Sequence, residues 1–387
     1  MPGIRVEVNS AIYEWVLQNI NVENIKTKMM DDFFLWMTDK KTPTFNQLEQ
    51  FSKATNIPFG YFFLSTPPIE KMELLEYRTV DSLNIEQPSR NLIDTINEME
   101  AVQEWMRDYV KGADLGELNY VGALKGNEDI GHIASTIKKG LRLSKDWFLD
   151  GSNAWDSFKL LRERLEDIGT IVMMSGIVGS NTRRSLDIKE FRAFTIVDKY
   201  APLIFINAKD STNGRLFSLA HEMTHVWLGV NNFYNDYEHH VNGTSSLEVL
   251  CNAVAAEILV PIEMFNTSWR EDRTDDLEDK SSNIAGYFRC GTTVIARRAL
   301  DQGLIDKATY TKLAEAAKVK YGEKRSEQGS GGNYYNTLKT RIDNRLVLAL
   351  RNSVYEGRTT FTEAYRLTNT SRKTFSALVE MVAGAEV

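Results

Sequence analysis

The chain has 387 residues, more than one typical domain, so two or three domains are expected. Its hydrophobic fraction of 42% and charged fraction of 26% are ordinary for a soluble globular protein. With 46 basic and 53 acidic residues, the net charge is −7. A charge of this sign excludes attraction of nucleic acid or anionic lipid to the molecule as a whole and leaves only a local patch open.

The number of cysteines and the first residues of the sequence indicate which cellular compartment to expect. Two cysteines, Cys251 and Cys290, are too few for a disulfide framework. The first ten residues lack the basic and then apolar pattern of a signal peptide, and the longest apolar run, near residues 171–178, is too short to span a bilayer. We therefore expect a cytoplasmic protein with no membrane contact.

Residues 1–70 are predicted to form a domain of short helices. Thr44 with Gln47 three residues later forms the capping-box pattern of a helix start, and Pro67-Pro68 ends the unit. The segment TPTFNQLEQFSKATNIPFGYFF resembles the second half of a repressor-type (XRE-type) helix-turn-helix domain. The resemblance implies that the preceding helix, about residues 30–38, would enter the major groove of DNA.

The charge of this N-terminal domain argues against that role. Its presumed DNA-reading helix carries Asp31 and Asp32, and residues 1–70 hold six basic and eight acidic side chains, a net charge of −2. A surface that reads a groove normally carries the opposite sign. A degenerate module reused for protein contacts fits this charge better than a DNA-binding one. Residues 71–150 follow as a mainly helical connector.

Residues 151–321 change to a pattern of helices and strands, with strands predicted at 170–174, 191–197 and 203–207. The last strand leads into the sequence HEMTH, in which His221 and His225 are four residues apart. On a helix this spacing places both imidazoles on one face, where they can hold one Zn²⁺. Glu222 lies beside them and can reach a metal-bound water without being a ligand, as in the H-E-x-x-H arrangement of metallopeptidases.

A catalytic zinc site needs a third protein ligand. The next candidates along the chain are His239, His240, Glu248 and Glu257. The two glutamates lie nine residues apart on one predicted helix, on opposite flanks of its apolar stripe, so only one of them can face a given metal. Spacing alone leaves the choice open. The alternative for Glu257 is a solvated or salt-bridged helix residue.

The segments RLFSLAHEMTHVWLG and EVLCNAVAAEILVP are similar to the ImmA/IrrE family of zinc metallopeptidases, with the likeness running from about residue 155 to 318. In that family a glutamate four residues before an asparagine completes the site, which implies Glu248 as the third ligand. Asn252 lies one helical turn after Glu248 on the same side and is a candidate to support a ligand by a hydrogen bond. A repressor-like N-terminal module is a common companion. This sequence has Leu250-Cys251 where the family often has Glu-Ala, a change that we expect to be tolerated.

The resulting fold expectation is α+β and mostly helical. A zincin-like metallopeptidase core with a small β-sheet is flanked by helical N- and C-terminal domains. Residues 322–333, rich in Gly and Ser, are predicted to be a flexible linker. Residues 334–387 are predicted to form a small helical domain with eight basic and five acidic residues, a net charge of +3, which reads most simply as a solvated surface.

Three functions remain open. The first is a zinc endopeptidase, in which Zn²⁺ lowers the pKa of its bound water to about 7 and Glu222 acts as the general base, with His239 or His240 available to stabilise the transition state. The resemblance implies a helix-turn-helix repressor as substrate, in a mobile-element or stress circuit. The second is a DNA-binding transcriptional regulator that uses the peptidase fold to sense metal or a partner. The third is an antitoxin-like binding protein.

Overall fold

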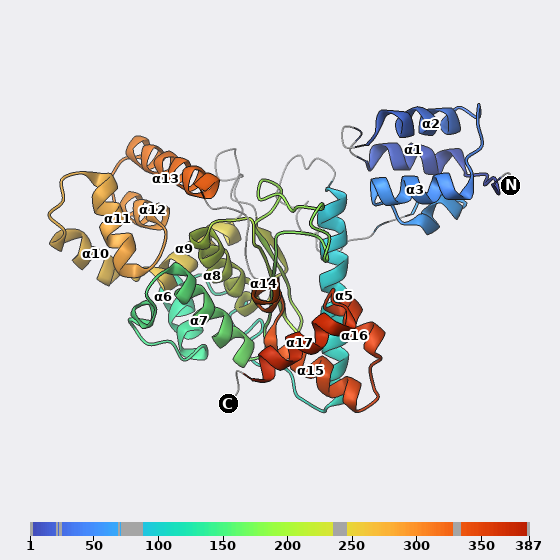
Figure 1. Ribbon diagram of the computed structural model, residues 1–387. Helices are drawn as coiled ribbons and strands as arrows, with labels where there is room; N and C mark the ends of the chain where they lie inside the picture. Colours follow the sequence, from blue (N-terminus) through green and yellow to red (C-terminus); the bar gives the residue numbers. More distant parts are fainter. Residues whose placement is uncertain are drawn as a thin grey trace. The chain divides into compact units, whose positions relative to one another are not determined.

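The computed structural model describes residues 3–20, 22, 25–68, 70, 88–234, 246–327 and 334–384. Contacts within the chain define two compact units. The first comprises residues 1–73 and 84–95, and the second comprises residues 74–83 and 96–387. The described residues are mostly helical with one small sheet, which fits the expected α+β class (Figure 1).

The first unit is a small helical module. Its elements are α1 (Ser10–Gln18), α2 (Thr27–Met37), α3 (Phe45–Thr55) and the 3-10 turn η2 (Phe59–Phe63). Both hydrogen bonds of the predicted capping box are present at the start of α3, between Thr44 and Gln47. Aromatic side chains fill the core, where the rings of Phe33 and Phe51 stack with centroids 4.6 Å apart. Buried apolar residues from every helix thus hold the unit together.

The second unit is organised around a four-stranded sheet. Its strands are β1 (Ile171–Ser175), β2 (Ala193–Ile196), β3 (Leu203–Asn207) and β4 (Asn232–Tyr234). The spatial order is β1-β3-β2-β4, with β1 parallel to β3 and the other pairs antiparallel. Strands β1 to β3 lie within a few residues of their predicted positions. Strand β4 was not predicted, because three residues are too few to give a periodic pattern.

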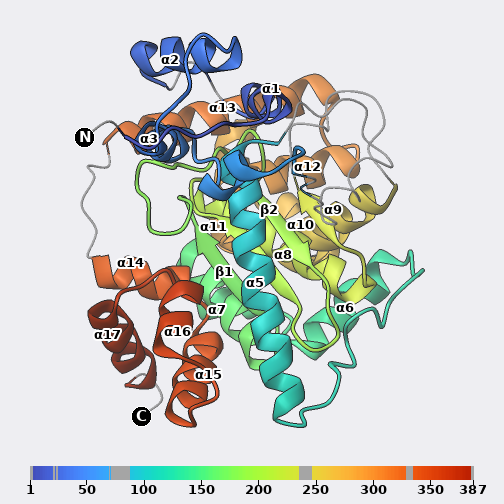
Figure 2. The ribbon, with the colours of Figure 1, turned by 90° about the vertical axis from the view of Figure 1, so that its right-hand side faces the viewer.

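Helices cover both faces of this sheet. The helical elements of this part of the chain are α5 (Arg90–Gly112), α6 (Ile130–Gly140), the 3-10 turn η3 (Trp147–Asp150), α7 (Ala154–Asp167), α8 (Thr212–Leu228) and α9 (Ser246–Leu259). Helix α8 packs on β2 and β3, with α7 and α9 against it. On the opposite face, Figure 2 shows α5 crossing in front of the strands, and Gln103 of α5 donates a hydrogen bond to the carbonyl of Ile196 in β2.

The chain then continues through a group of helices beyond α9. They are α10 (Ile262–Glu271), α11 (Leu277–Phe288), α12 (Thr292–Asp301) and α13 (Lys307–Glu327). The predicted linker at 322–333 starts inside α13, which continues to Glu327, while residues 328–333 lie outside the described residues. Lysine and glutamate, which favour helix, occupy much of 322–327 and extend α13 into the segment expected as linker.

The last four helices are α14 (Tyr334–Arg341), α15 (Asn344–Tyr355), α16 (Phe361–Leu367) and α17 (Arg372–Ala383). They form a group that meets the sheet through α14 and the residue before α15. The buried carboxylate of Asp343 accepts a hydrogen bond of 2.9 Å from the backbone N–H of Val172, on the outer edge of β1. Arg162 of α7 donates to the carbonyl of Ile342 at 2.7 Å. These contacts join partners about 170 residues apart in the chain, so no local pattern could reveal them.

Helix α8 is fixed at both ends. The hydroxyl of Ser211 accepts from the N–H of Gly214 at 2.9 Å, and Gly229 ends the helix in the left-handed conformation at φ +72°, as its position predicted. The loop before α6 also contributes, because the N–H of Gly122 donates to the carbonyl of Val226 at 3.0 Å. Among the described residues, no helix is both long and apolar enough to cross a membrane.

The contact at the end of α8 predicts a strong effect of Gly229→Ala. A Cβ at this position would lie 2.8 Å from the Cα of Gly122, whereas one at Gly303, which has φ +66°, would meet no atom within 4 Å. Gly303→Ala should therefore cost only the left-handed strain, about 1–2 kcal/mol. Gly229→Ala should cost about 1–3 kcal/mol more from the clash. Urea unfolding of both variants measures the difference, and equal costs would contradict the close packing.

Candidate metal centre

Two histidines of α8 meet on the face that the sequence predicted. The Nε2 atoms of His221 and His225 are 3.1 Å apart, and their ring centroids are separated by 4.9 Å. Both side chains have an exposed fraction of 0%. Their neighbours Leu219, Ala220 and Met223 are buried in the core, so the apolar stripe of the helix fixes how the imidazoles are presented.

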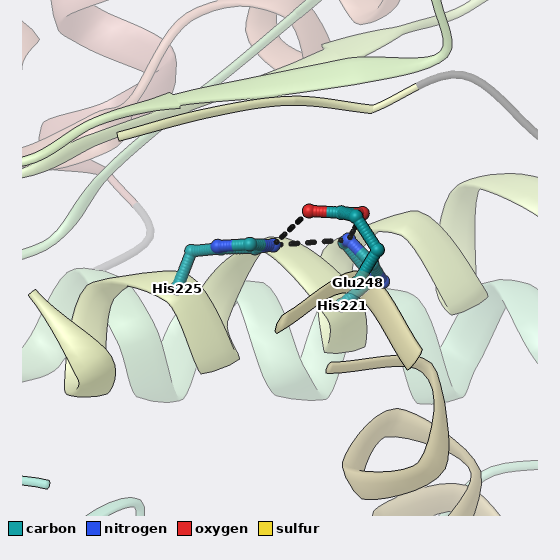
Figure 3. A group of neighbouring side chains, drawn as sticks. All are labelled: His221, His225 and Glu248. Carbon is teal, nitrogen blue, oxygen red and sulfur yellow. Dashed lines mark hydrogen bonds and ion pairs between the residues drawn. The ribbon is translucent and has the colours of Figure 1, made fainter. Parts of the chain in front are cut away.

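A carboxylate from the neighbouring helix completes the group. Glu248, in the first turn of α9, places Oε2 at 3.2 Å from Nε2 of His221 and Oε1 at 3.3 Å from Nε2 of His225. Figure 3 shows the three side chains converging, the imidazoles from one helix and the carboxylate from the other. The carboxylate retains 25% exposure, while Cys251 one turn later is fully buried and anchors α9.

The spacing of these atoms fits a tetrahedral zinc site. Two ligand atoms bound about 2.0–2.1 Å from a tetrahedral Zn²⁺ are separated by about 3.3 Å. The two Nε2 atoms are 3.1 Å apart, and each lies close to a different oxygen of Glu248, at 3.2 Å for His221 and 3.3 Å for His225. With one ligand atom taken from each residue, the three atoms all lie within 4.8 Å of one another. Two histidines and one carboxylate are also a ligand set that catalytic zinc sites use, leaving the fourth position for water. The residues present therefore fit a zinc ion.

Asn252 orients one of the two imidazoles. Its Oδ1 lies 3.0 Å from Nδ1 of His221 and accepts the hydrogen of that nitrogen. With the proton on Nδ1, the lone pair of Nε2 points into the group. Such an outer hydrogen bond fixes the tautomer and the ring plane of a metal ligand. The contact of Asn252 is thus made with His221, a ligand on the neighbouring helix.

Electrostatic effects within the group favour a cation. Burial opposes ionisation of Glu248, but its hydrogen bonds to both imidazoles outweigh burial and keep the pKa of Glu248 below its ordinary value. Burial also lowers the pKa of His225, whereas at His221 the contact with Glu248 outweighs burial and raises the pKa. A carboxylate held in its charged form among buried groups is stabilised by a bound cation.

Glu222 is the second carboxylate of the centre and is completely buried. Its Oε2 accepts a hydrogen bond of 2.5 Å from the hydroxyl of Thr195, a residue of β2. Its Oε1 has no hydrogen-bond partner among the described residues. Burial raises the pKa of Glu222 to about 8. A divalent cation nearby favours the ionised form and so opposes this increase.

The remaining predicted residues divide into two groups. Glu257 belongs to a structural ion pair, because Nη2 of Arg298 lies 2.6 Å from its Oε2, which is the alternative that the sequence left open. His239 and His240 lie outside the described residues. Thr195 was not predicted as a site residue. Its strand was predicted, but the contact between that strand and α8 depends on tertiary packing that the sequence pattern does not contain.

The centre lies within a stretch that matches a known peptidase family. Residues 180–300 match the family Peptidase_M78, described as the IrrE N-terminal-like domain. This part of the chain is therefore similar to a family of metal-dependent peptidases. This Peptidase_M78 stretch contains β2, β3, α8, β4 and α9 with all four residues of the centre, and it lies within the range of the ImmA/IrrE resemblance.

A second match covers residues 342–381, described as a domain of unknown function (DUF8813), which corresponds to α15, α16 and most of α17. Both matches lie after residue 179. The comparisons found no similar protein among the curated proteins and no similar solved structure. The helix-turn-helix resemblance of the N-terminal unit thus stays a prediction.

The geometry predicts that purified protein binds about one zinc per chain through this centre. Glu248→Ala should weaken zinc binding by more than the about 10- to 100-fold expected for Asn252→Ala, which removes only an outer partner. Glu257→Ala is the matched control, since it removes a carboxylate from the same helix and should leave zinc binding unchanged. Competition with a zinc-chelating dye measures each affinity. Equal zinc binding by the two glutamate variants would contradict the ligand assignment.

Proposed function

We propose that this protein is a zinc-dependent endopeptidase that cleaves one specific regulatory protein. The observation that carries the proposal is the convergence of His221, His225 and Glu248 near a fully buried second carboxylate, Glu222. Separate roles for two carboxylates follow from their contacts. Glu248 is paired with both imidazoles and acts as a ligand, while Glu222 leaves one oxygen atom without a partner among the described residues.

The residues of this chain have distinct parts in the proposed hydrolysis. When bound, zinc supplies Lewis acidity, which polarises a carbonyl and lowers the pKa of water from 15.7 to about 7. Oε1 of Glu222 accepts the proton of the attacking water and later releases it to the leaving amine. Asn252 keeps Nε2 of His221 available as a ligand through its contact with Nδ1. The burial of Glu222 excludes bulk water from its carboxylate.

The sheet offers a binding mode for an extended substrate. Strand β4 lies at one end of the sheet and pairs with β2. At the other end, Asp343 occupies the outer edge of β1 through its bond to Val172. An extended peptide can therefore add to the sheet along β4 by backbone hydrogen bonds. In the proposed complex, this pairing lays the scissile bond beside the metal centre.

The proposed substrate is a helix-turn-helix repressor, and the N-terminal unit is proposed to contact protein and not DNA. In α2, the helix that would read DNA, Phe34 and Leu35 are 46% and 38% exposed. Asp31 is exposed on the same helix, and Asp32 pairs with Lys41 at 2.6 Å. An apolar and acidic surface suits a protein partner better than a phosphate backbone.

Glu222→Gln should retain the metal and the fold but abolish cleavage. Glutamine keeps an oxygen and the size of the side chain, but it cannot accept the proton of water at neutral pH. The measurement is co-expression of active or Glu222→Gln protein with the reading frames next to its gene, followed by a search for a fragment formed only with active protein. A fragment formed equally with both proteins would show that Glu222 is not the base.

The N-terminal unit should not bind DNA specifically. We expect the full-length Glu222→Gln protein to give no competitor-resistant gel shift with duplex DNA from upstream of its own gene at about 0.15 M salt. Its acidic, apolar α2 surface is the physical reason. A shift with a dissociation constant below about 10⁻⁷ M under these conditions would instead support a DNA-binding regulator.

A further inference from the structure

Thr195 forms a buried contact with Glu222, the proposed general base. It lies in β2, on the side of the strand that faces α8, and has an exposed fraction of 0%. Its Oγ1 lies 2.5 Å from Oε2 of Glu222 and 3.3 Å from the main-chain oxygen of the same residue. The hydroxyl thus meets two acceptors of a single glutamate.

A hydroxyl has one hydrogen to donate, so these two acceptors compete for it. The carboxylate contact is shorter by 0.8 Å, from the two distances of 2.5 and 3.3 Å. Hydrogen bonds from a hydroxyl to a charged oxygen are typically about 2.5–2.7 Å long and are stronger than neutral ones. The hydrogen of Thr195 therefore goes to Oε2 of Glu222.

This bond gives the two carboxylate oxygens different surroundings. Oε2 is held by the sheet, whereas Oε1 is buried and has no hydrogen-bond partner among the described residues. We propose that Thr195 is the positioning residue of the general base: it locks the rotamer of Glu222 so that Oε1 is the oxygen presented to the attacking water. The inference rests on the proposed peptidase function and assigns it one further residue.

The local environment does not require a hydroxyl for packing. Ala193, two residues earlier on the same side of β2, is part of the apolar core against α8. Valine is β-branched like threonine and has nearly the same shape, so Thr195→Val changes the hydroxyl while nearly keeping the volume of the side chain. A buried hydroxyl without a partner is costly, and here its short bond is made to Glu222. The hydroxyl thus has a use that is specific to the carboxylate.

Two substitutions separate positioning from packing. Thr195→Val keeps the shape and removes the hydroxyl, whereas Thr195→Ser keeps the hydroxyl and removes a methyl group. A purely structural role predicts that serine is the more damaging change, because it leaves a cavity. A positioning role predicts the opposite order. Thr170→Val is a matched control, since it removes another fully buried hydroxyl, the one that contacts Tyr120 at 2.7 Å.

The experiment uses the full chain and two readouts. The first is kcat and KM for the target found by co-expression. The second is the binding of acetohydroxamic acid to cobalt-substituted protein, followed by the visible spectrum. This acid binds a metal through its two oxygens and passes its O–H proton to a carboxylate beside the metal, so its affinity reports the position of that carboxylate without turnover.

Thr195→Val should lower kcat by about 10- to 100-fold, with KM and metal content unchanged. It should also weaken the binding of acetohydroxamic acid to the cobalt-substituted protein by about tenfold. Thr195→Ser should stay within about threefold of the native protein on both readouts, and Thr170→Val should match it. The inference is overturned if Thr195→Val has the kcat and acetohydroxamate affinity of the native protein. It is also overturned if Thr195→Ser loses as much kcat and affinity as Thr195→Val.

Failure of the proposed function gives a different result. In that case the native protein neither cleaves the target nor binds cobalt and acetohydroxamate. The peptidase function and the positioning role of Thr195 are then rejected together. If instead the native protein is active, Glu222→Gln is inactive and Thr195→Val is indistinguishable from native, the peptidase stands and only the positioning role is rejected.

Discussion

The structure depends on one constraint: two imidazoles and two carboxylates are held together, and all but the partly exposed Glu248 are fully buried. Glu222, His221 and His225 are fully buried, and the two imidazoles keep Glu248 in its charged form. Buried charge is costly unless it is compensated. A divalent cation at the point where the nitrogen and oxygen ligands converge would compensate it and, in the proposed function, would supply Lewis acidity for hydrolysis.

The rest of the second unit keeps these groups in place. Helix α8 is capped at both ends and packed on β2 and β3, and α9 brings Glu248 across to it. The C-terminal helices reach the same sheet from the other side of β1, through Asp343. The match described as a domain of unknown function includes Asp343, whose bond to Val172 ties these helices to the edge of the sheet.

The sequence predicted the features that depend on local spacing. The i, i+4 pair His221 and His225, the terminal Gly229 and the capping box at Thr44 follow from helix geometry, and the structure contains all three. Features that join distant segments of the chain could not be predicted from local sequence patterns. The Thr195 to Glu222 bond and the docking of Asp343 on β1 arise from tertiary packing. For Glu248, spacing left two candidates, and a family resemblance decided between them.

The most direct test of the account is zinc X-ray absorption spectroscopy on the purified protein. The proposed centre should give a four-coordinate zinc with nitrogen and oxygen neighbours only, at about 2.0–2.1 Å, including the outer-shell scattering of two imidazoles. Cys251 lies three residues after Glu248 and is buried, and burial raises the pKa of its thiol, so it should not be a ligand. A zinc–sulfur distance of about 2.3 Å, or one imidazole instead of two, would contradict the proposed centre.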